Sequence, residues 1–293
     1  MKKIALSFIL IVCFGSLSWA QDTESAPKKV KDKPVRAPFQ SGYLIDNQTT
    51  YIPSPKTLEL AIQHKFGSLN NGISDLFGIY APAANIRLGL NYVVHKNVQV
   101  GYGVTRLNMY NDFNVKWTIL EQTRNNTIPV AVGFYGTMAI DGRNDKVFGT
   151  EYRFMNRFSY FSQLIVGRKM NDWLSLQVNS SFTHFNSTDS LIDHDKISVG
   201  FNGRAQFSPQ SSILFQCDFP LKIQGIAEHR SFTNPAKPNL GIAWEISTST
   251  HTFHIYVSSA DAIIPQHNAL FNQNDWKNGG LMFGFNITRL WSF

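Results

Sequence analysis

The sequence contains little cysteine and no long hydrophobic run. It has 2 Cys among 293 residues, and only Cys217 lies beyond the first 20 residues, so an intramolecular disulfide framework is excluded. No segment after residue 20 provides the roughly 20 consecutive apolar residues of a membrane-spanning helix. The formal net charge is +7, but basic residues are scattered through the chain, and this pattern argues against a nucleic-acid partner.

The N-terminus has the three parts of an export signal. Lys2 and Lys3 are followed by an apolar stretch over residues 4–14, and then by Ser18-Trp19-Ala20. We predict a signal peptide over residues 1–20 that is cleaved after Ala20. A lipid anchor on Cys13 is the rival interpretation, which its bulky and apolar neighbours disfavour.

Residues 21–56 are basic and rich in proline, and they offer few apolar side chains for a core. We predict a disordered or extended periplasmic lead-in, irregular over residues 41–56. The positive charge of residues 21–40 could bind a periplasmic partner, although a plain soluble linker is the favoured interpretation. The basic residues and prolines of this lead-in are Lys28, Lys29, Lys31, Lys33, Arg36, Pro27, Pro34 and Pro38.

Aromatic residues are abundant, with 23 Phe, 10 Tyr and 6 Trp, and apolar residues alternate with small polar ones from residue 57 onward. A period of two predicts strands with one apolar face. We count twelve such segments, and the polar face is rich in Gly, Asn, Gln and Ser, as a wet lumen requires. The segments lie near residues 58–66, 86–92, 98–104, 115–119, 129–139, 157–167, 174–182, 197–204, 213–219, 240–246, 253–257 and 279–293.

The connections alternate in length, being short after even-numbered segments and mostly long after odd-numbered ones. Outer-membrane barrels have short periplasmic turns and long external loops. The fold class predicted for residues 57–293 is therefore all-β: an antiparallel up-and-down transmembrane barrel of about twelve strands in the cell outer membrane, in contact with lipid.

The last segment, residues 279–293, resembles the C-terminal signal that the barrel-assembly machinery of gram-negative bacteria recognises. Its apolar face consists of Phe285, Ile287, Trp291 and Phe293. Arg289 alternates in step with these apolar residues and should therefore face the lipid. We expect either that its side chain reaches the lipid headgroups at the interface or that a bulge turns it inward.

Residues 57–122 also resemble an outer-membrane β-barrel family of gram-negative bacteria whose function is unassigned. The resemblance implies the architecture and no activity. Its residues are Glu59, His64-Lys65-Phe66-Gly67, Asp75-Leu76-Phe77-Gly78, Arg87-Leu88-Gly89, Tyr92, Gly101, Arg106, Lys116 and the closing Gly284-Phe285-Asn286-Ile287-Thr288-Arg289. The family more often has Arg where Lys65 stands, so the planar fork of Arg is absent there.

Charged residues on the polar faces are the candidate site. They could form a selectivity constriction, or they could brace a closed interior, and the sequence leaves both open. These lumen candidates are Glu59, Lys65, Arg87, Lys116, Arg204 and Glu245. Residues 72–82 in the first long loop could fold inward as a plug or gate, or simply pack.

The function predicted is a narrow, non-enzymatic pore or transporter for small polar or ionic solutes. The alternative is a structural or docking barrel that binds a partner through its external loops or basic tail. A lipid-modifying enzyme using His184 with Asn186 and Ser187 comes third, because that spacing is not typical of such enzymes. The sequence predicts no cofactor and no metal site, since His251 and His254 fall on opposite faces of a strand.

Overall fold

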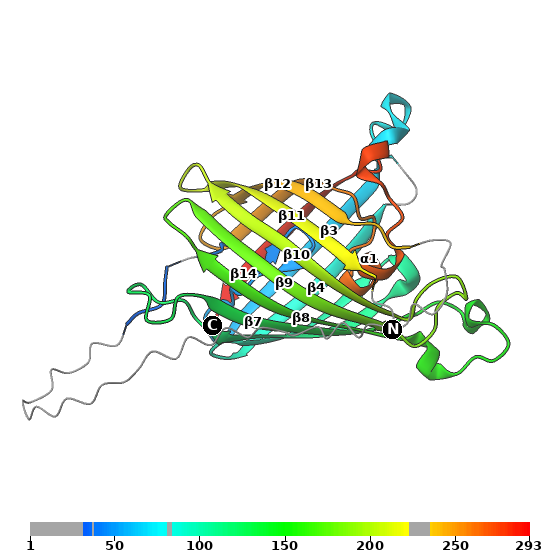
Figure 1. Ribbon diagram of the computed structural model, residues 1–293, viewed down its shortest axis with the longest axis horizontal. Coiled ribbons are helices and arrows are strands. Elements are labelled where there is room, and N and C mark those ends of the chain that lie inside the picture. The colour runs from blue at the N-terminus through cyan, green and yellow to red at the C-terminus, as the bar shows by residue number, and fades with distance from the viewer. Residues whose placement is uncertain (1–31, 37, 81–83, 223–234) are drawn as a thin grey trace, which may run out of the picture. The chain divides into compact units, whose positions relative to one another are not determined.

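Twelve antiparallel strands form one closed barrel in the computed structural model (Figure 1), which describes residues 32–36, 38–80, 84–222 and 235–293. Each strand pairs with its neighbours in sequence, and β14 pairs with β3 to close the wall. The predicted fold class is confirmed. The wall strands are β3 Thr57–Ser68, β4 Asn85–His95, β5 Val98–Thr105, β6 Asn111–Leu120, β7 Ala131–Ile140, β8 Phe158–Lys169, β9 Leu174–Phe185, β10 Asp195–Gln206, β11 Ser211–Leu221, β12 Asn239–Ser247, β13 His251–Ser258 and β14 Met282–Ser292.

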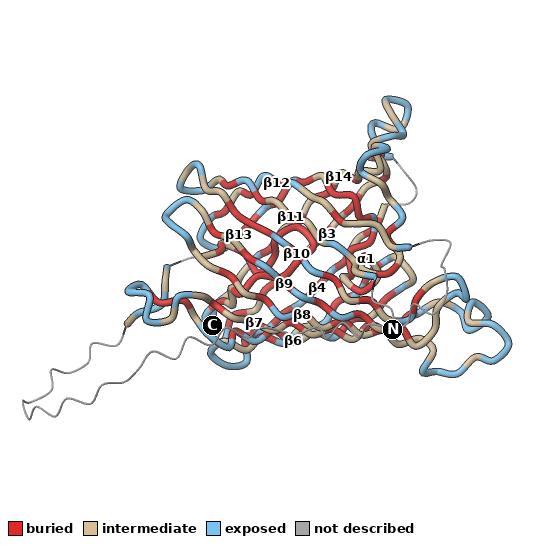
Figure 2. The backbone as a smooth tube through the Cα atoms, viewed as in Figure 1, coloured by how far each residue is buried: buried red, intermediate tan, exposed pale blue. Residues whose placement is uncertain are grey.

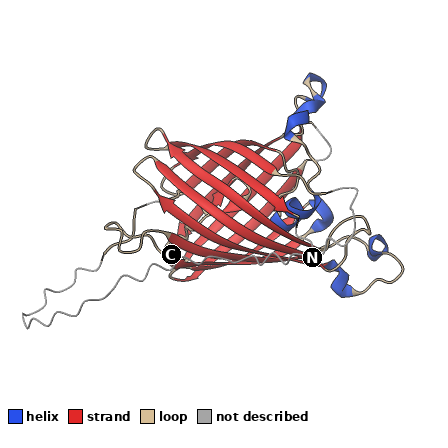
Figure 3. Cartoon of the chain, in the orientation of Figure 1, coloured by secondary structure: helices blue, strands red, loops and turns tan. Residues whose placement is uncertain are grey.

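The two ends of the barrel differ. At the "turn end", short connections join β4 to β5, β8 to β9, β10 to β11 and β12 to β13, and the wall begins at Thr57 and finishes at Ser292. At the "loop end" lie the long connections, which contain the helical elements (Figure 3). These are η1 Leu69–Asn71, η2 Ile73–Asp75, η3 Leu107–Met109, η4 Asp145–Phe148, η5 Phe154–Arg157, α1 Pro265–Phe271 and η6 Trp276–Asn278. Among the described residues, no helix has the length and apolarity needed to cross a membrane.

The last strand is shorter than predicted. It begins at Met282 rather than Gly279, because η6 ends at Asn278 and is capped by Gly279 with a left-handed φ of 74°. Glycine adopts this conformation without a steric penalty.

Burial alternates along the wall with the predicted period of two (Figure 2). Inward positions carry polar and charged side chains, whereas outward positions expose large apolar ones over most of the wall. Apolar patches this extensive are rare on soluble monomers, and they fit a barrel surrounded by lipid. Exposed outward side chains include Leu88, Leu90, Val100, Val104, Phe113, Val115, Trp117, Leu164, Val178, Phe182, Val199, Phe201, Ile213, Ile242, Trp244 and Ile255.

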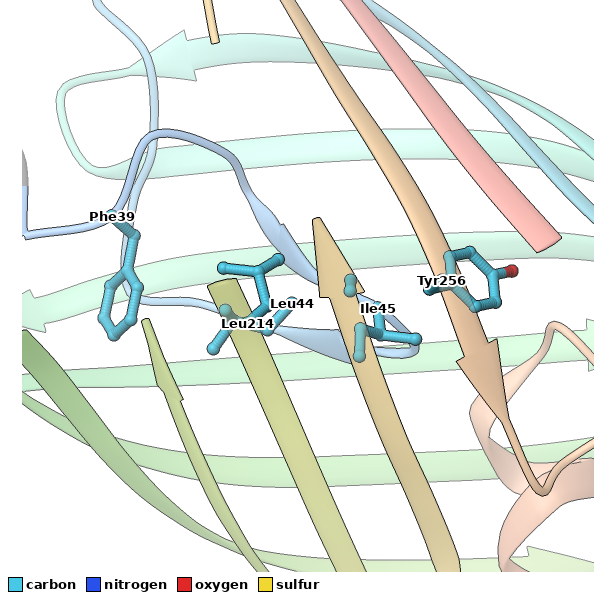
Figure 4. Packing of buried hydrophobic residues seen from close by; sticks show 6 residues of the cluster. Phe39, Leu44, Ile45, Leu214 and Tyr256 are labelled. Carbon is cyan, nitrogen blue, oxygen red and sulfur yellow. The ribbon is translucent and has the colours of Figure 1, made fainter. Parts of the chain in front are cut away.

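A short hairpin occupies the lumen, which corrects the predicted irregular lead-in. Strands β1 Tyr43–Leu44 and β2 Asn47–Gln48 pair only with each other and form a sheet separate from the barrel. Residues 41–50, here called the hairpin, are all buried. Its apolar side chains Leu44 and Ile45, with Phe39 just before the hairpin, cluster with inward residues of the wall. These wall residues are Leu214, Ala243 and Tyr256 (Figure 4). The apolar inward residues of the wall therefore provide the hydrophobic core that the hairpin cannot form by itself.

The chain reaches the hairpin from the turn end. Pro34 forms a β-bridge with Thr123 in the β6–β7 connection, and the Val35 amide donates to the Gln122 carbonyl at 2.8 Å. The predicted signal peptide, its cleavage site and residues 21–31 lie outside the described residues and remain predictions.

Candidate functional site

The tip of the hairpin is bound to the wall by a buried ion pair. The Lys65 Nζ of β3 lies 2.9 Å from Asp46 Oδ1 and donates to the Ala260 carbonyl at 2.7 Å. Asn239 of β12 donates to Asp46 Oδ2 at 2.9 Å. Because buried charges require partners, Lys65 and Asp46 each fix the position of the other.

Wall side chains also satisfy the backbone of the hairpin, which makes no ladder with any wall strand. Buried backbone groups need hydrogen-bond partners, and amide and hydroxyl side chains from several wall strands supply them here. Gln216 Oε1 accepts from the amides of Asp46 and Asn47, Asn286 donates to the Ile45 carbonyl, Gln177 donates to the Gln48 carbonyl, and Thr118 donates to the Thr50 carbonyl.

Arg87 braces the wall. Its Nε and Nη2 donate to the two carboxylate oxygens of Asp112 at 2.8 and 2.6 Å, and Nη1 donates to Gln63 at 3.1 Å. The guanidinium lies over Gly89 and Gly103, which face each other across β4 and β5. A Cβ added to Gly89 would lie 2.7 Å from Arg87 Nη1, and one on Gly103 would be closer still to Nη2. The two glycines therefore leave the space that the Arg87 guanidinium occupies.

Glu59 and Lys116 flank the hairpin near Gly42. The Lys116 Nζ donates to the Gly42 carbonyl at 2.9 Å and to Gln48 at 3.2 Å. Glu59 accepts from Asn91 and Gln99 at 3.1 and 2.9 Å. A Cβ on Gly42 would lie 3.0 Å from Lys116 Nζ and 3.7 Å from Glu59 Oε1. Lys116, a residue of the wall, thus also holds the hairpin in place through these hydrogen bonds.

Arg204 and Glu245 form a second brace, with Arg204 Nε donating to Glu245 Oε1 at 2.7 Å. The second carboxylate oxygen lies 3.2 Å from His254 Nε2. All six predicted lumen candidates are therefore buried in the lumen. Lys65 and Lys116 bind the hairpin, Arg87 with Asp112 and Arg204 with Glu245 form braces, and Glu59 lies beside the hairpin with its hydrogen bonds directed to the wall residues Asn91 and Gln99. The proposed role in selectivity stays a prediction.

Helix α1 covers the lumen at the loop end, a feature that the sequence reasoning missed. It buries Gln266, Asn268 and Leu270 and packs against β8, β9 and β10. Pro at its first turn is favoured there and was the available signal. Seven residues are too few to show a helical period.

A cavity of about 300 Å³ lies beside α1, where Tyr110, Arg143 and Arg157 face His267. Burial lowers the pKa of His267 to about 4, so its ring is neutral near neutral pH. Burial also raises the pKa of Tyr110 to about 12. Arg143 forms an ion pair with Asp141 at 2.6 Å, which raises its pKa.

The first long loop, between β3 and β4, does not fold inward. Ile73 is 81% exposed and Tyr80 is 73% exposed, and residues 69–80 project away from the barrel in Figure 1. The lumen is filled by the hairpin and covered by α1 instead. Of the two alternatives for residues 72–82, the inward plug is therefore excluded for the part that the structure describes.

His184 is engaged on both sides. Its Nδ1 lies 2.6 Å from Asp195 Oδ1, and its Nε2 lies 3.0 Å from Asn186 Oδ1. No hydrogen bond between His184 and a serine occurs in the described part of the chain. Within the same part, no group of three or more His, Cys, Asp or Glu converges to hold a metal ion.

Arg289 points outward near the turn end. Its guanidinium lies 4.7 Å from the ring centroid of Trp291. The pairing with β3 is regular at this point, and the register shift in β14 lies between Met282 and Gly284. Arg289 thus takes the predicted outward position, stacked on an aromatic ring.

The family model and the first of two similar solved structures agree with the barrel architecture. Residues 39–291 match the family model "Membrane bound beta barrel domain (DUF5777)". The crystal structure of the COG4313 outer membrane channel from Pseudomonas putida F1 is similar, with a TM-score of 0.51 and 9% identity over 83% of this chain and 97% of that one. The NanC porin has a TM-score of 0.48 and 9% identity over 80% and 98% of the two chains. No curated protein sequence matches the chain.

Proposed function

The chain belongs to the DUF5777 family of membrane-bound β-barrel domains, and from this premise we propose that it is an outer-membrane channel for small polar or ionic solutes, gated by the hairpin. In this proposal the turn end faces the periplasm and the loop end faces the exterior. The hairpin closes the lumen in the conformation described above, and solute passes when it withdraws toward the periplasm.

The separateness of the hairpin sheet carries the proposal. Strands β1 and β2 pair only with each other, and the ladder of the barrel is complete without them. The hairpin can therefore leave without breaking a backbone hydrogen bond between wall strands. The lumen left behind is lined by polar residues such as Gln163, Gln177 and Asn202, as in a water-filled barrel.

The closed state has the lower free energy in the isolated protein. Burial of an apolar side chain contributes about 1.5–3 kcal/mol, and Phe39, Leu44 and Ile45 are each at most 1% exposed. Ile45 adopts a positive φ of 60° at the tip, which costs roughly 1–2 kcal/mol for a residue with a Cβ. The tip therefore stores some strain that withdrawal releases, yet opening still requires a partner or another source of free energy.

Planar-bilayer conductance of residues 21–293 tests this function. We expect the parent protein to be mostly closed, and Ile45→Ser to conduct more often because it weakens the apolar contacts of the hairpin. Ile73→Ser is the matched control, since Ile73 is 81% exposed on an external loop. A folded Ile45→Ser barrel, verified by gel heat-modifiability, that conducts no more often than the parent would contradict the gate.

A docking role is the second candidate, and the projecting loop favours it. Ile73, Phe77 and Tyr80 are exposed apolar residues at the loop end, where they lie beyond the wall rather than on it. Exposed apolar groups of this kind are typical of binding surfaces. Surface cross-linking on intact cells that is lost in a combined Ile73→Ser and Tyr80→Ser variant, with unchanged conductance, would support docking.

A further inference from the structure

The cavity of about 300 Å³ beside α1 has no part in the proposed gate. Its lining includes Tyr110, Arg143, Arg157, Phe185 and His267. These residues come from the start of β6, the β7–β8 connection, the end of β9 and α1. A volume of this size lies at the lower end of the range for small-molecule sites, so the cavity can hold a small organic molecule.

Two guanidinium groups converge in this cavity. The Cζ atoms of Arg143 and Arg157 lie 6.0 and 5.1 Å from the centroid of the same Phe148 ring. The Arg157 Nη1 also donates to the backbone carbonyls of Asp141 and Arg143 at 2.8 and 2.5 Å. Arg143 Nη1 and Arg157 Nη2 form no hydrogen bond within the described part of the chain. Each arginine therefore keeps a donor for a ligand.

The charged side chains of the lining favour an anion. Asp141 accepts from Arg143 Nε and Nη2 at 3.0 and 2.6 Å, whereas Arg157 forms no ion pair with a carboxylate of the described residues and its Nε donates to the Tyr152 hydroxyl at 2.6 Å. Asp261 also lies near His267, but it is exposed and does not line the cavity. The lining thus carries two positive charges against one negative charge.

Aromatic rings form the other side of the cavity. The Phe271 ring packs edge-to-face against Phe185, with centroids 4.9 Å apart, and its centroid lies 4.8 Å from that of the His267 ring. The His267 Nδ1 is buried and has no hydrogen-bond partner among the described residues, although buried polar groups are normally satisfied. A neutral imidazole can carry its proton on Nδ1 and donate to an anionic oxygen.

A ligand that fits both sides has one negative charge and a flat apolar body. Guanidinium groups recognise carboxylates through charge-assisted hydrogen bonds, and aromatic side chains pack well against planar groups. We propose that the cavity binds a small organic carboxylate, with its anionic oxygens at Arg143 and Arg157 and its body against Phe185 and Phe271. An inorganic anion would use the guanidinium groups but leave the aromatic side without a partner.

Isothermal titration calorimetry of residues 21–293 in detergent tests the site, with sodium benzoate as the probe. We expect saturable binding to the parent protein. Benzyl alcohol has the ring without the charge, and sodium acetate has the charge without the ring, so each should bind at least about tenfold more weakly. Benzoate that binds no more tightly than either analogue would overturn the proposal.

Arg157→Gln removes the surplus positive charge and should weaken benzoate binding by roughly 10- to 100-fold. Ser187→Phe fills part of the cavity, which Ser187 lines, and should abolish binding while both arginines remain. Arg153→Gln is the matched control, because Arg153 is exposed in the same connection and does not line the cavity. Gel heat-modifiability verifies that each variant is folded. Benzoate binding that is unchanged in Ser187→Phe, or weakened equally in Arg153→Gln, would overturn the site.

Binding at this cavity stands on its own geometry, and only a role in capturing the solute rests on the proposed channel. The two can fail separately. Benzoate binding that is lost in Arg157→Gln and Ser187→Phe, in a barrel that never conducts, would keep the site and overturn the channel. Conductance that increases in Ile45→Ser, in a protein that binds no benzoate, would keep the gate and overturn the site.

Discussion

The Nζ of Lys65 and the carboxylate of Asp46 lie 2.9 Å apart, with side-chain exposures of 0% and 5%. Lys65 belongs to the first strand of the wall, and Asp46 belongs to the hairpin that precedes it. The pair therefore joins the mobile element of the proposed gate to its frame. Buried pairs add little net stability, but removal of one partner leaves an uncompensated charge.

Asp46→Asn should loosen the hairpin without opening the wall. The substitution leaves the Lys65 ammonium buried beside a neutral amide, at a cost of roughly 3–5 kcal/mol. Hydrogen exchange of residues 41–50 should accelerate, whereas exchange in the strands stays slow. Combining Asp46→Asn with Lys65→Met removes the stranded charge and should restore part of the protection. Unchanged exchange in the single variant would contradict the role of the pair.

Arg87→Lys should destabilise the barrel by about 1–3 kcal/mol, because an ammonium cannot reproduce the two parallel bonds to Asp112. The midpoint of the heat-modifiability transition on gels should fall. Arg153→Lys, at an exposed position in the β7–β8 connection, should leave the midpoint unchanged. A variant as stable as the parent would show that the fork to Asp112 is dispensable.

Gly103→Ala should displace the Arg87 guanidinium, since a Cβ at this position would overlap its Nη2. Overpacking of an interior costs roughly 1–3 kcal/mol, and the loss should resemble that of Arg87→Lys because both variants disturb one brace. Gly136→Ala, at an outward position of β7, is the matched control. The check is the same gel transition, and strictly additive losses in a Gly103→Ala and Arg87→Lys double variant would argue against a shared mechanism.

Acid should release α1 from the mouth of the barrel. The docked His267 has a pKa of about 4 against an ordinary value of 6.5, so the docked state binds fewer protons than the released state. Docking is therefore fully stable above pH 6.5 and weakens as the pH falls from 6.5 toward 4. The groups around His267 are Asp261, Arg143 and Asp141.

Quenching of a fluorophore at Ala269→Cys, in a Cys217→Ser background, follows the release of α1. Quenching should increase across this pH window in the parent and remain flat in a His267→Gln variant. An acid response that persists in His267→Gln would assign the release to the neighbouring carboxylates.

The wall of the barrel was predictable because each strand repeats a two-residue pattern over eight or more residues. The side on which Glu59, Arg87 or Glu245 lies follows directly from parity. The partner of each charged residue does not follow from parity. Arg87 lies beside Asp112 only because of the register in which β4, β5 and β6 pair. Pairing across strands depends on tertiary packing, which a single chain does not display.

The hairpin escaped prediction because its strands have two residues each, and no period is visible over that length. Gly42, the apolar pair Leu44-Ile45 and the following Asp46-Asn47 were the available signal for a turn. Their burial depends on a lumen built from residues that come later in the chain. Basic, proline-rich neighbours made the whole segment resemble a linker.

The hairpin tip is held by the two strands that meet at the barrel seam, with Lys65 on β3 and Asn286 on β14. Asn286 donates to the Ile45 carbonyl at 2.8 Å. Because β14 follows every other wall strand in the sequence, its contact with the tip can form only after those strands have been synthesised. Both seam strands must therefore be in place before the tip is fully held, and in the open state of the proposed gate Lys65 loses Asp46 and Asn286 loses the Ile45 carbonyl.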